Sequence, residues 1–153
     1  MVVQPLLIFI ALFFMGCHKP LEPIGTYQPL TTLVAKHGKA LDEEKIKRLE
    51  GKEVQVWGYL DRDNLLLEER IPRFVLKRYP DDTIGSGVGV RLMGSRESYQ
   101  RSFEPLKDID TEQPIRVLVK GKLYTFARPT NFSTSTGVGL RVESVEDILV
   151  LWD

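Results

Sequence analysis

The sequence predicts an all-β domain with minor helices, in which three strands, one helix and two strands follow one another. Three observations predict it. From residue 51 onward, apolar and polar residues alternate with the period of a half-buried β-strand. This period changes once, after Ser95, where the apolar residues take the spacing of a helix face. Two of the predicted strands contain an interior glycine, Gly58 and Gly121, which is typical of a strand that coils or bulges.

Five strands are predicted from this alternation and from the turn residues that bound it. The strands span 54–60, 71–78, 88–93, 115–126 and 138–142, and a last turn or edge strand spans 144–151. Polar turns at 61–64 and 127–137 separate the first strand from the second and the fourth from the fifth. In the first strand, Gln55, Trp57 and Tyr59 lie on the face opposite to the valines.

Helices are predicted before the sheet and between its third and fourth strands. Two short helices occupy 30–50, one ended by Gly38 and the other capped by Asp42 and ended by Gly51. The later helix begins after Ser95, and three residues form its apolar face: Tyr99, Phe103 and Leu106.

The order of these elements resembles the OB-fold over about residues 51–150. Segments 51–60 and 117–123 look like strands one and four of that fold. The resemblance implies a domain at 51–153 that is a five-stranded Greek-key barrel with a helix between strands three and four. Closure removes the two open edges that a five-stranded meander would leave. A two-layer α+β sheet and an SH3-like barrel are the alternative architectures.

The amino terminus carries an apolar run at 6–15, followed by Gly16 and the only cysteine, Cys17. Because a membrane-spanning helix needs roughly 20 residues, this run is typical of a signal peptide instead. The segment 14–17 resembles the signal of bacterial lipoproteins. That resemblance implies removal of 1–16, acylation of Cys17 with palmitate among the chains, and a Pro-rich tether at 17–29. A plain secretory signal and an uncleaved anchor are the alternatives.

By the same resemblance, His18 in place of Asp after the cysteine implies a location at the outer membrane, on its periplasmic side. The 21 Lys and Arg residues balance the 21 Asp and Glu residues, so a basic field over the whole protein is absent. Nucleic acid is therefore not the favoured partner. A single cysteine excludes an internal disulfide and a cysteine-rich metal site. We predict no catalytic residue, no metal and no cofactor.

The sharpest candidate site is a ligand-binding face on the first three strands. It consists of outward aromatic and arginine residues: Trp57, Tyr59, Arg73 and Arg91. Aromatic rings interleaved with arginines stack on planar groups and pair with anions. Alternatively, Trp57 and Tyr59 pack beneath the amino-terminal helices. A second basic strip, interpreted as keeping a strand edge soluble, contains Arg116, Lys120, Lys122 and Arg141.

These features predict a membrane-anchored, non-catalytic binding or assembly module of the cell envelope, whose partner is an envelope protein or a glycan. An oligonucleotide-binding domain is the first alternative. The second is a metal-dependent nuclease, in which an arginine, Arg70 or Arg91, meets a phosphate. Its divalent ion would be held by Asp61, Asp63, Glu68 and Glu69, which are also typical of an ordinary polar turn.

Overall fold

A computed structural model of the chain describes residues 19–34, 44, 47–48, 50–83, 87–107, 112–129, 131 and 134–151. In chain order, its elements are β1 (Gln28–Pro29), η1 (Leu30–Thr32), β2 (Glu53–Leu66), β3 (Arg73–Lys77), β4 (Val88–Leu92), α2 (Arg96–Lys107), β5 (Arg116–Pro129), β6 (Thr134–Val142), η2 (Val145–Asp147) and β7 (Ile148–Leu151). No helix in the described ranges combines the length and the apolar character that crossing a membrane requires.

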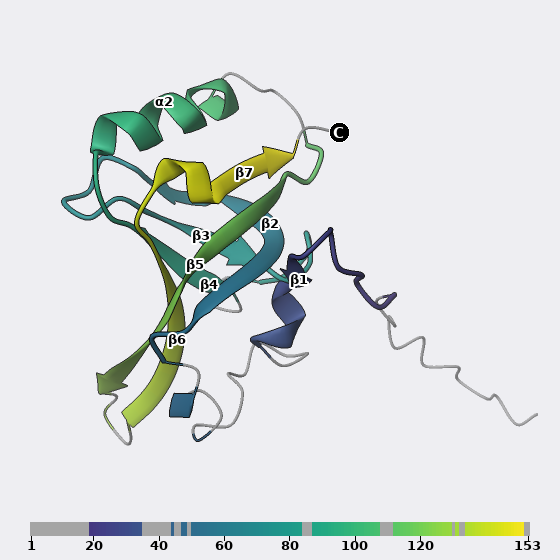
Figure 1. Cartoon of the computed structure of the whole chain (residues 1–153), viewed down its shortest axis with the longest axis vertical. Coiled ribbons are helices and arrows are strands. Elements are labelled where there is room, and N and C mark those ends of the chain that lie inside the picture. Colours follow the sequence, from purple (N-terminus) through teal and green to yellow (C-terminus); the bar gives the residue numbers. More distant parts are fainter. Residues whose placement is uncertain are drawn as a thin grey trace, which may run out of the picture.

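Five of the strands close into a barrel (Figure 1). Around it, β2 pairs with β3, β3 with β4, β4 with β6, β6 with β5, and β5 with β2 again. The β4–β6 pair is parallel, and the other four are antiparallel. Outside this ring, β1 pairs with β2 and β7 pairs with β5. The predicted all-β barrel is therefore confirmed.

The barrel closes because β2 changes partner along its length. Its first half pairs with β5 from Glu53 to Tyr59, and its second half pairs with β3 from Tyr59 onward. Gly58 stands just before the change, where a Cβ atom would lie 2.9 Å from the carbonyl oxygen of Lys77. The missing side chain therefore lets β3 approach β2 closely at the point where the strand coils.

The core is formed by the inward residues of the barrel strands together with residues from α2 and the amino-terminal segment. Figure 1 shows α2 lying across one end of the barrel. From α2, Phe103 packs on Phe74 of β3 with ring centroids 5.3 Å apart. The hydroxyl of Tyr99 donates to the carbonyl oxygen of Met93 at 2.6 Å. Burial raises the pKa of this hydroxyl, and the charge of Asp147 raises it further.

The two predicted turns are wrong in extent, because strand pairing continues through both. Residues 61–64 lie inside β2, with a shift in register between Asp61 and Leu66. The Asp61 carboxylate accepts from the Asp63 N–H at 3.3 Å and from Asn64 Nδ2 at 2.8 Å, so these polar residues satisfy a bulge within the strand. Likewise, the hairpin of β5 and β6 remains paired out to Pro129 and Thr134, which shortens the predicted loop.

The amino-terminal segment lies against the barrel. Of the predicted tether, Cys17 and His18 lie outside the described residues, whereas β1 pairs in parallel with β2. At the start of the predicted helical region, η1 is a single 3-10 turn that buries Leu30 completely. Half of the second predicted helix lies outside the described residues.

Candidate functional site

Four basic side chains form a continuous row across the outer face of the barrel. This basic row takes one residue from each of four neighbouring strands: Arg73 of β3, Arg91 of β4, Arg141 of β6 and Lys122 of β5. Each stands directly opposite the next in the strand register, and the flanking residues of β4 and β6 point into the core. With strands about 4.8 Å apart, the row spans about 14 Å.

The two ends of the basic row have carboxylate partners, and its centre does not. Arg73 Nε lies 3.0 Å from a carboxylate oxygen of Glu69, and Lys122 Nζ lies 3.3 Å from one of Glu143. Within the part of the chain that the structure describes, neither central arginine forms an ion pair. Positive charge is therefore concentrated at the middle of the row.

An aromatic ring and two glycines adjoin the central arginines. The guanidinium carbons of Arg91 and Arg141 lie 4.7 Å and 5.8 Å from the ring centroid of Tyr124. A Cβ atom at Gly139 would overlap that ring, so the ring lies directly over the glycine. Beside Gly139 in the register stands Gly89, above which the space is open. We call this pair of glycines the glycine floor.

This arrangement is unfavourable for folding. Like charges directly opposite each other on neighbouring strands repel, and the basic row contains three such pairs in succession. Cation–π contacts with one tyrosine offset only part of that repulsion. An anion held between the central arginines would relieve it, so the row has the chemistry of an anion-binding site.

Of the predicted ligand-binding residues, the structure places only Arg73 and Arg91 in the basic row. Trp57 is 4 % exposed, although it lies on the outer side of β2. Its Nε1–H donates to the carbonyl oxygen of Glu22 at 3.0 Å, and Pro29 of β1 stands beside it in the register. Trp57 therefore packs beneath the amino-terminal segment, as the alternative prediction stated. The residues that cover it are extended, whereas that prediction expected helices.

Tyr59 is half-buried and packs edge-on against Trp57, with ring centroids 5.6 Å apart. It borders a polar hollow of about 690 Å³ that also includes Asp61, Asp63 and Lys77. Since Tyr59 pairs with Lys77 at the far end of β3 from Arg73, this hollow is separate from the basic row.

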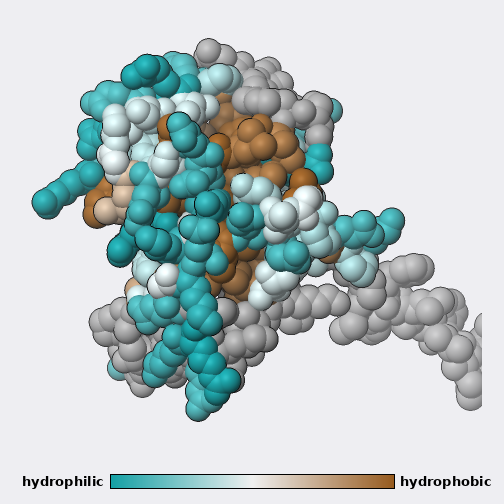
Figure 2. All heavy atoms as spheres, viewed as in Figure 1, coloured by the Kyte–Doolittle hydropathy of each residue, from teal (hydrophilic) through white to brown (hydrophobic). Residues whose placement is uncertain are grey.

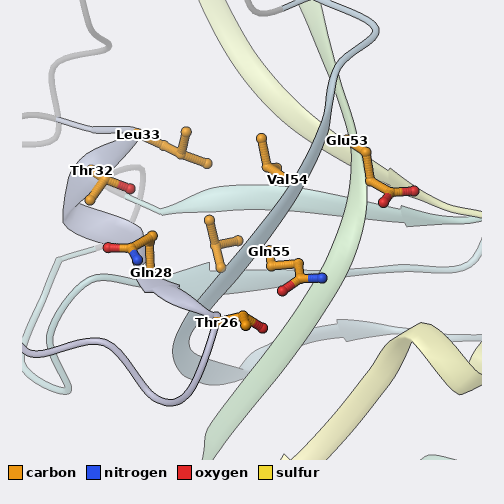
Figure 3. Close-up of a pocket in the computed structure, with 8 residues that line it drawn as sticks. Thr26, Gln28, Thr32, Leu33, Glu53, Val54 and Gln55 are labelled. Atoms are coloured by element: carbon orange, nitrogen blue, oxygen red, sulfur yellow. The ribbon is translucent and has the colours of Figure 1, made fainter.

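A second hollow, of about 360 Å³, opens between the amino-terminal segment and the start of β2. Figure 3 shows that polar and aliphatic side chains line it: Thr26, Gln28, Thr32 and Leu33 on one side, and Glu53, Val54 and Gln55 on the other. Its charged residue, Glu53, pairs with Lys120 at 3.4 Å. None of the described residues that line this hollow is a cation.

Three of the four carboxylates of the nuclease hypothesis are engaged within the chain. Asp61 holds the bulge of β2, Glu68 accepts from Gln100 at 2.8 Å, and Glu69 pairs with Arg73. Among the described residues, no three aspartate, glutamate, histidine or cysteine side chains are grouped as metal ligands. No observation favours metal-dependent cleavage.

Sequence reasoning placed Lys122 and Arg141 in a second strip and did not join them to the first site. Their outward orientation follows from alternation, and the structure confirms it. Their position beside Arg91 depends on the parallel pairing of β4 with β6, which no local pattern encodes. The same alternation predicts that Tyr124, two residues after Lys122, faces outward. This outward tyrosine was the feature of the sequence from which the aromatic part of the site could have been predicted.

Comparisons of the chain with protein-family models, with curated proteins and with solved structures give no match.

Proposed function

We propose that the protein is a lipid-anchored, non-catalytic binding module of the bacterial cell envelope, built on an OB-type barrel. It binds an anionic partner, an envelope protein or a glycan, across β3, β4, β6 and β5. The observation that carries this proposal is the basic row, whose central arginines have no carboxylate partner among the described residues. Mutual repulsion along the row is explained if a bound anion neutralises it.

Strand order supports the OB assignment. The neighbours β5, β2, β3 and β4 are the fourth, first, second and third strands of the barrel, which is the spatial order of a Greek key. The helix α2 comes between the third and fourth barrel strands, β4 and β5. OB domains bind ligands on their second and third strands, here β3 and β4, which carry Arg73 and Arg91.

The lipid anchor is supported by the sequence around Cys17, and the proposed location is the periplasmic face of the outer membrane. We expect cells that express the chain to incorporate labelled palmitate into it, because acylation attaches fatty acids to this cysteine. Replacement of Cys17 by serine is expected to abolish the label and to release the protein into the soluble fraction. Label retained after Cys17→Ser would contradict the anchor.

Anion binding is tested by Arg91→Gln. We expect this variant to bind a labelled polyglutamate or heparin about tenfold to a hundredfold more weakly, because a charge-assisted hydrogen bond stabilises a complex by roughly 1.5–3 kcal/mol. Fluorescence anisotropy at fixed ionic strength measures the dissociation constants. Arg141→Gln is expected to have a similar effect, since both guanidinium groups adjoin Tyr124.

The matched control is Lys120→Gln, which removes one positive charge from β5 two residues from Lys122, outside the basic row and paired with another strand. Lys120 pairs with Glu53 and stands opposite Gln55 of β2. Its replacement is expected to leave both dissociation constants unchanged. Equal weakening by Lys120→Gln and Arg91→Gln would show that net charge alone governs binding, and the site assignment would be wrong.

Oligonucleotide binding is the second candidate, and one observation favours it. Tyr124 and Phe126 stand side by side on β5 with ring centroids 6.0 Å apart, which is an arrangement on which bases stack. A single-stranded oligonucleotide that binds more tightly than polyglutamate, with affinity that falls steeply with salt, would favour this candidate.

A further inference from the structure

Two exposed apolar side chains lie beside the basic row, on the same face of the barrel. Ile71 is 45 % exposed and Met93 is 38 % exposed. The last N–H of β4 donates to the carbonyl oxygen of Pro72 at 2.8 Å, just beyond the Arg73–Arg91 pair. Ile71 precedes β3 and Met93 follows β4, and burial still alternates there, because Pro72 and Leu92 are buried. Both apolar side chains therefore face outward, two residues and about 7 Å from the arginines.

The charges around the row limit how long a charged ligand can be. Glu69 and Glu143 neutralise its two ends. A continuous polyanion, polyglutamate included, can pair with the central arginines, but it also brings negative charge against both glutamates, which lowers its affinity. A ligand with one or two anionic groups, held between Arg91 and Arg141, avoids that repulsion.

Along β4, the outer face thus presents three different surfaces at intervals of two residues. These are the apolar pair, the central arginines and the open glycine floor, represented here by Met93, which follows β4, and by Arg91 and Gly89 of β4. Alternate side chains of an extended peptide are also spaced about 7 Å apart. An extended peptide that runs along β4 therefore places one alternate side chain against each of the three surfaces.

We propose that the partner is a protein segment that lies extended along β4, with an acidic residue at the arginines and an apolar residue two positions away at the apolar pair. The next matching position carries a small residue, because it faces the glycine floor beside Tyr124. This inference rests on the proposed anion-binding function and names the class of partner. Charge complementarity selects the acidic residue, and burial of Ile71 and Met93 selects the apolar one.

Three labelled peptides of equal length test this inference against the full chain in mild detergent. The first carries Leu and Asp two positions apart in a Ser and Gly background, the second carries them adjacent, and the third replaces Leu by Ser. Fluorescence anisotropy is expected to show that the first peptide binds about tenfold more tightly than the other two, as burial of one leucine allows. Similar affinity for all three peptides would overturn the inference.

Protein variants locate the effect. The double variant Ile71→Ser with Met93→Ser is expected to bind the first and third peptides equally, because the apolar contact is gone while the arginines remain. The control is Leu149→Ser, on β7, which removes a leucine that is 55 % exposed and stands opposite Leu118 of β5, outside the basic row, and it is expected to preserve the difference. Figure 2 shows a hydrophobic area at the place where Figure 1, in the same view, draws β7 across the barrel. Loss of the difference in Leu149→Ser alone would place the peptide there and overturn the inference.

The two proposals fail in different ways. If Arg91→Gln does not weaken the binding of either anionic probe, the proposed binding function is wrong, and the inference that rests on it is wrong too. If Arg91→Gln weakens polyglutamate but the spacing and the leucine have no effect on the peptides, only the inference is wrong. Tighter binding of anionic phospholipid vesicles or of an oligonucleotide than of the first peptide would also overturn it, since the partner would then belong to another class.

Discussion

Replacement of Asp82 by alanine is expected to lower the free energy of unfolding by about 3–5 kcal/mol, because it leaves the charge of Arg78 buried without its carboxylate partner. Arg78 Nε lies 3.0 Å from Asp82 Oδ2, and the two side chains are only 4 % and 9 % exposed. The same carboxylate accepts from the N–H groups of Arg78 and Tyr79 at 3.0 Å and 3.2 Å. It therefore also holds the backbone of the segment after β3. Chemical unfolding followed by circular dichroism measures the change.

The chain contains a closely matched control for this experiment. Glu69 and Arg73 are also four residues apart and also have a distance of 3.0 Å between Nε and a carboxylate oxygen, but their side chains are 45 % and 51 % exposed. Glu69→Ala is therefore expected to cost less than about 1 kcal/mol, because water solvates the exposed arginine. Equal losses for Asp82→Ala and Glu69→Ala would show that burial does not decide the contribution of the Arg78 pair.

Trp57→Ala is expected to lower the free energy of unfolding by about 3–5 kcal/mol, as truncation of a buried aromatic side chain does. Trp57 is buried outside the main core cluster, between β2 and the amino-terminal segment. Its loss removes the packing that holds this segment on the barrel. We expect guanidinium unfolding to detect the loss and proteolysis to cut the amino-terminal segment faster than in the unaltered chain.

Trp57→Phe separates this packing role from a role in ligand binding. Phenylalanine keeps most of the ring contacts and loses the hydrogen bond to Glu22, which is expected to cost about 0.5–1.5 kcal/mol. Because Trp57 lies away from the basic row, Trp57→Phe is expected to bind polyglutamate as the unaltered chain does. If this stable variant binds polyglutamate more weakly, Trp57 takes part in ligand binding, as the sequence analysis first predicted.

Much of the fold could be predicted because the facing of a strand residue is a local property. Alternation identified Val88, Val90 and Leu92 as inward and Arg91 as outward, and the structure confirms each of these orientations. Turn extent was harder to predict. The polar residues at 61–64 have the composition of a turn, yet β2 pairs with β3 on both sides of them, at Asp61 and at Leu66, so that they form a bulge within the strand.

The candidate site was predicted only in part, for the same physical reason. Arg73 and Arg91 were both identified as outward cations, and their strands are consecutive, so their contact needed a single hairpin. Arg141 reaches the same row through a parallel pairing between strands that are separated by α2 and β5. Trp57 was identified as outward, yet a segment about 30 residues earlier in the chain covers it.

By itself, then, the sequence determined the period of most segments, the side that meets the core for every barrel strand except 71–78, whose facing was ambiguous, and the cysteine where an anchor is expected. Tertiary structure alone decided which strands are neighbours and in what register. From that register come the alignment of four cations, the position of Gly139 beneath Tyr124 and the burial of Trp57. The physical reason is that alternation arises from the geometry of one strand, whereas register arises from hydrogen bonds and packing between segments far apart in the chain.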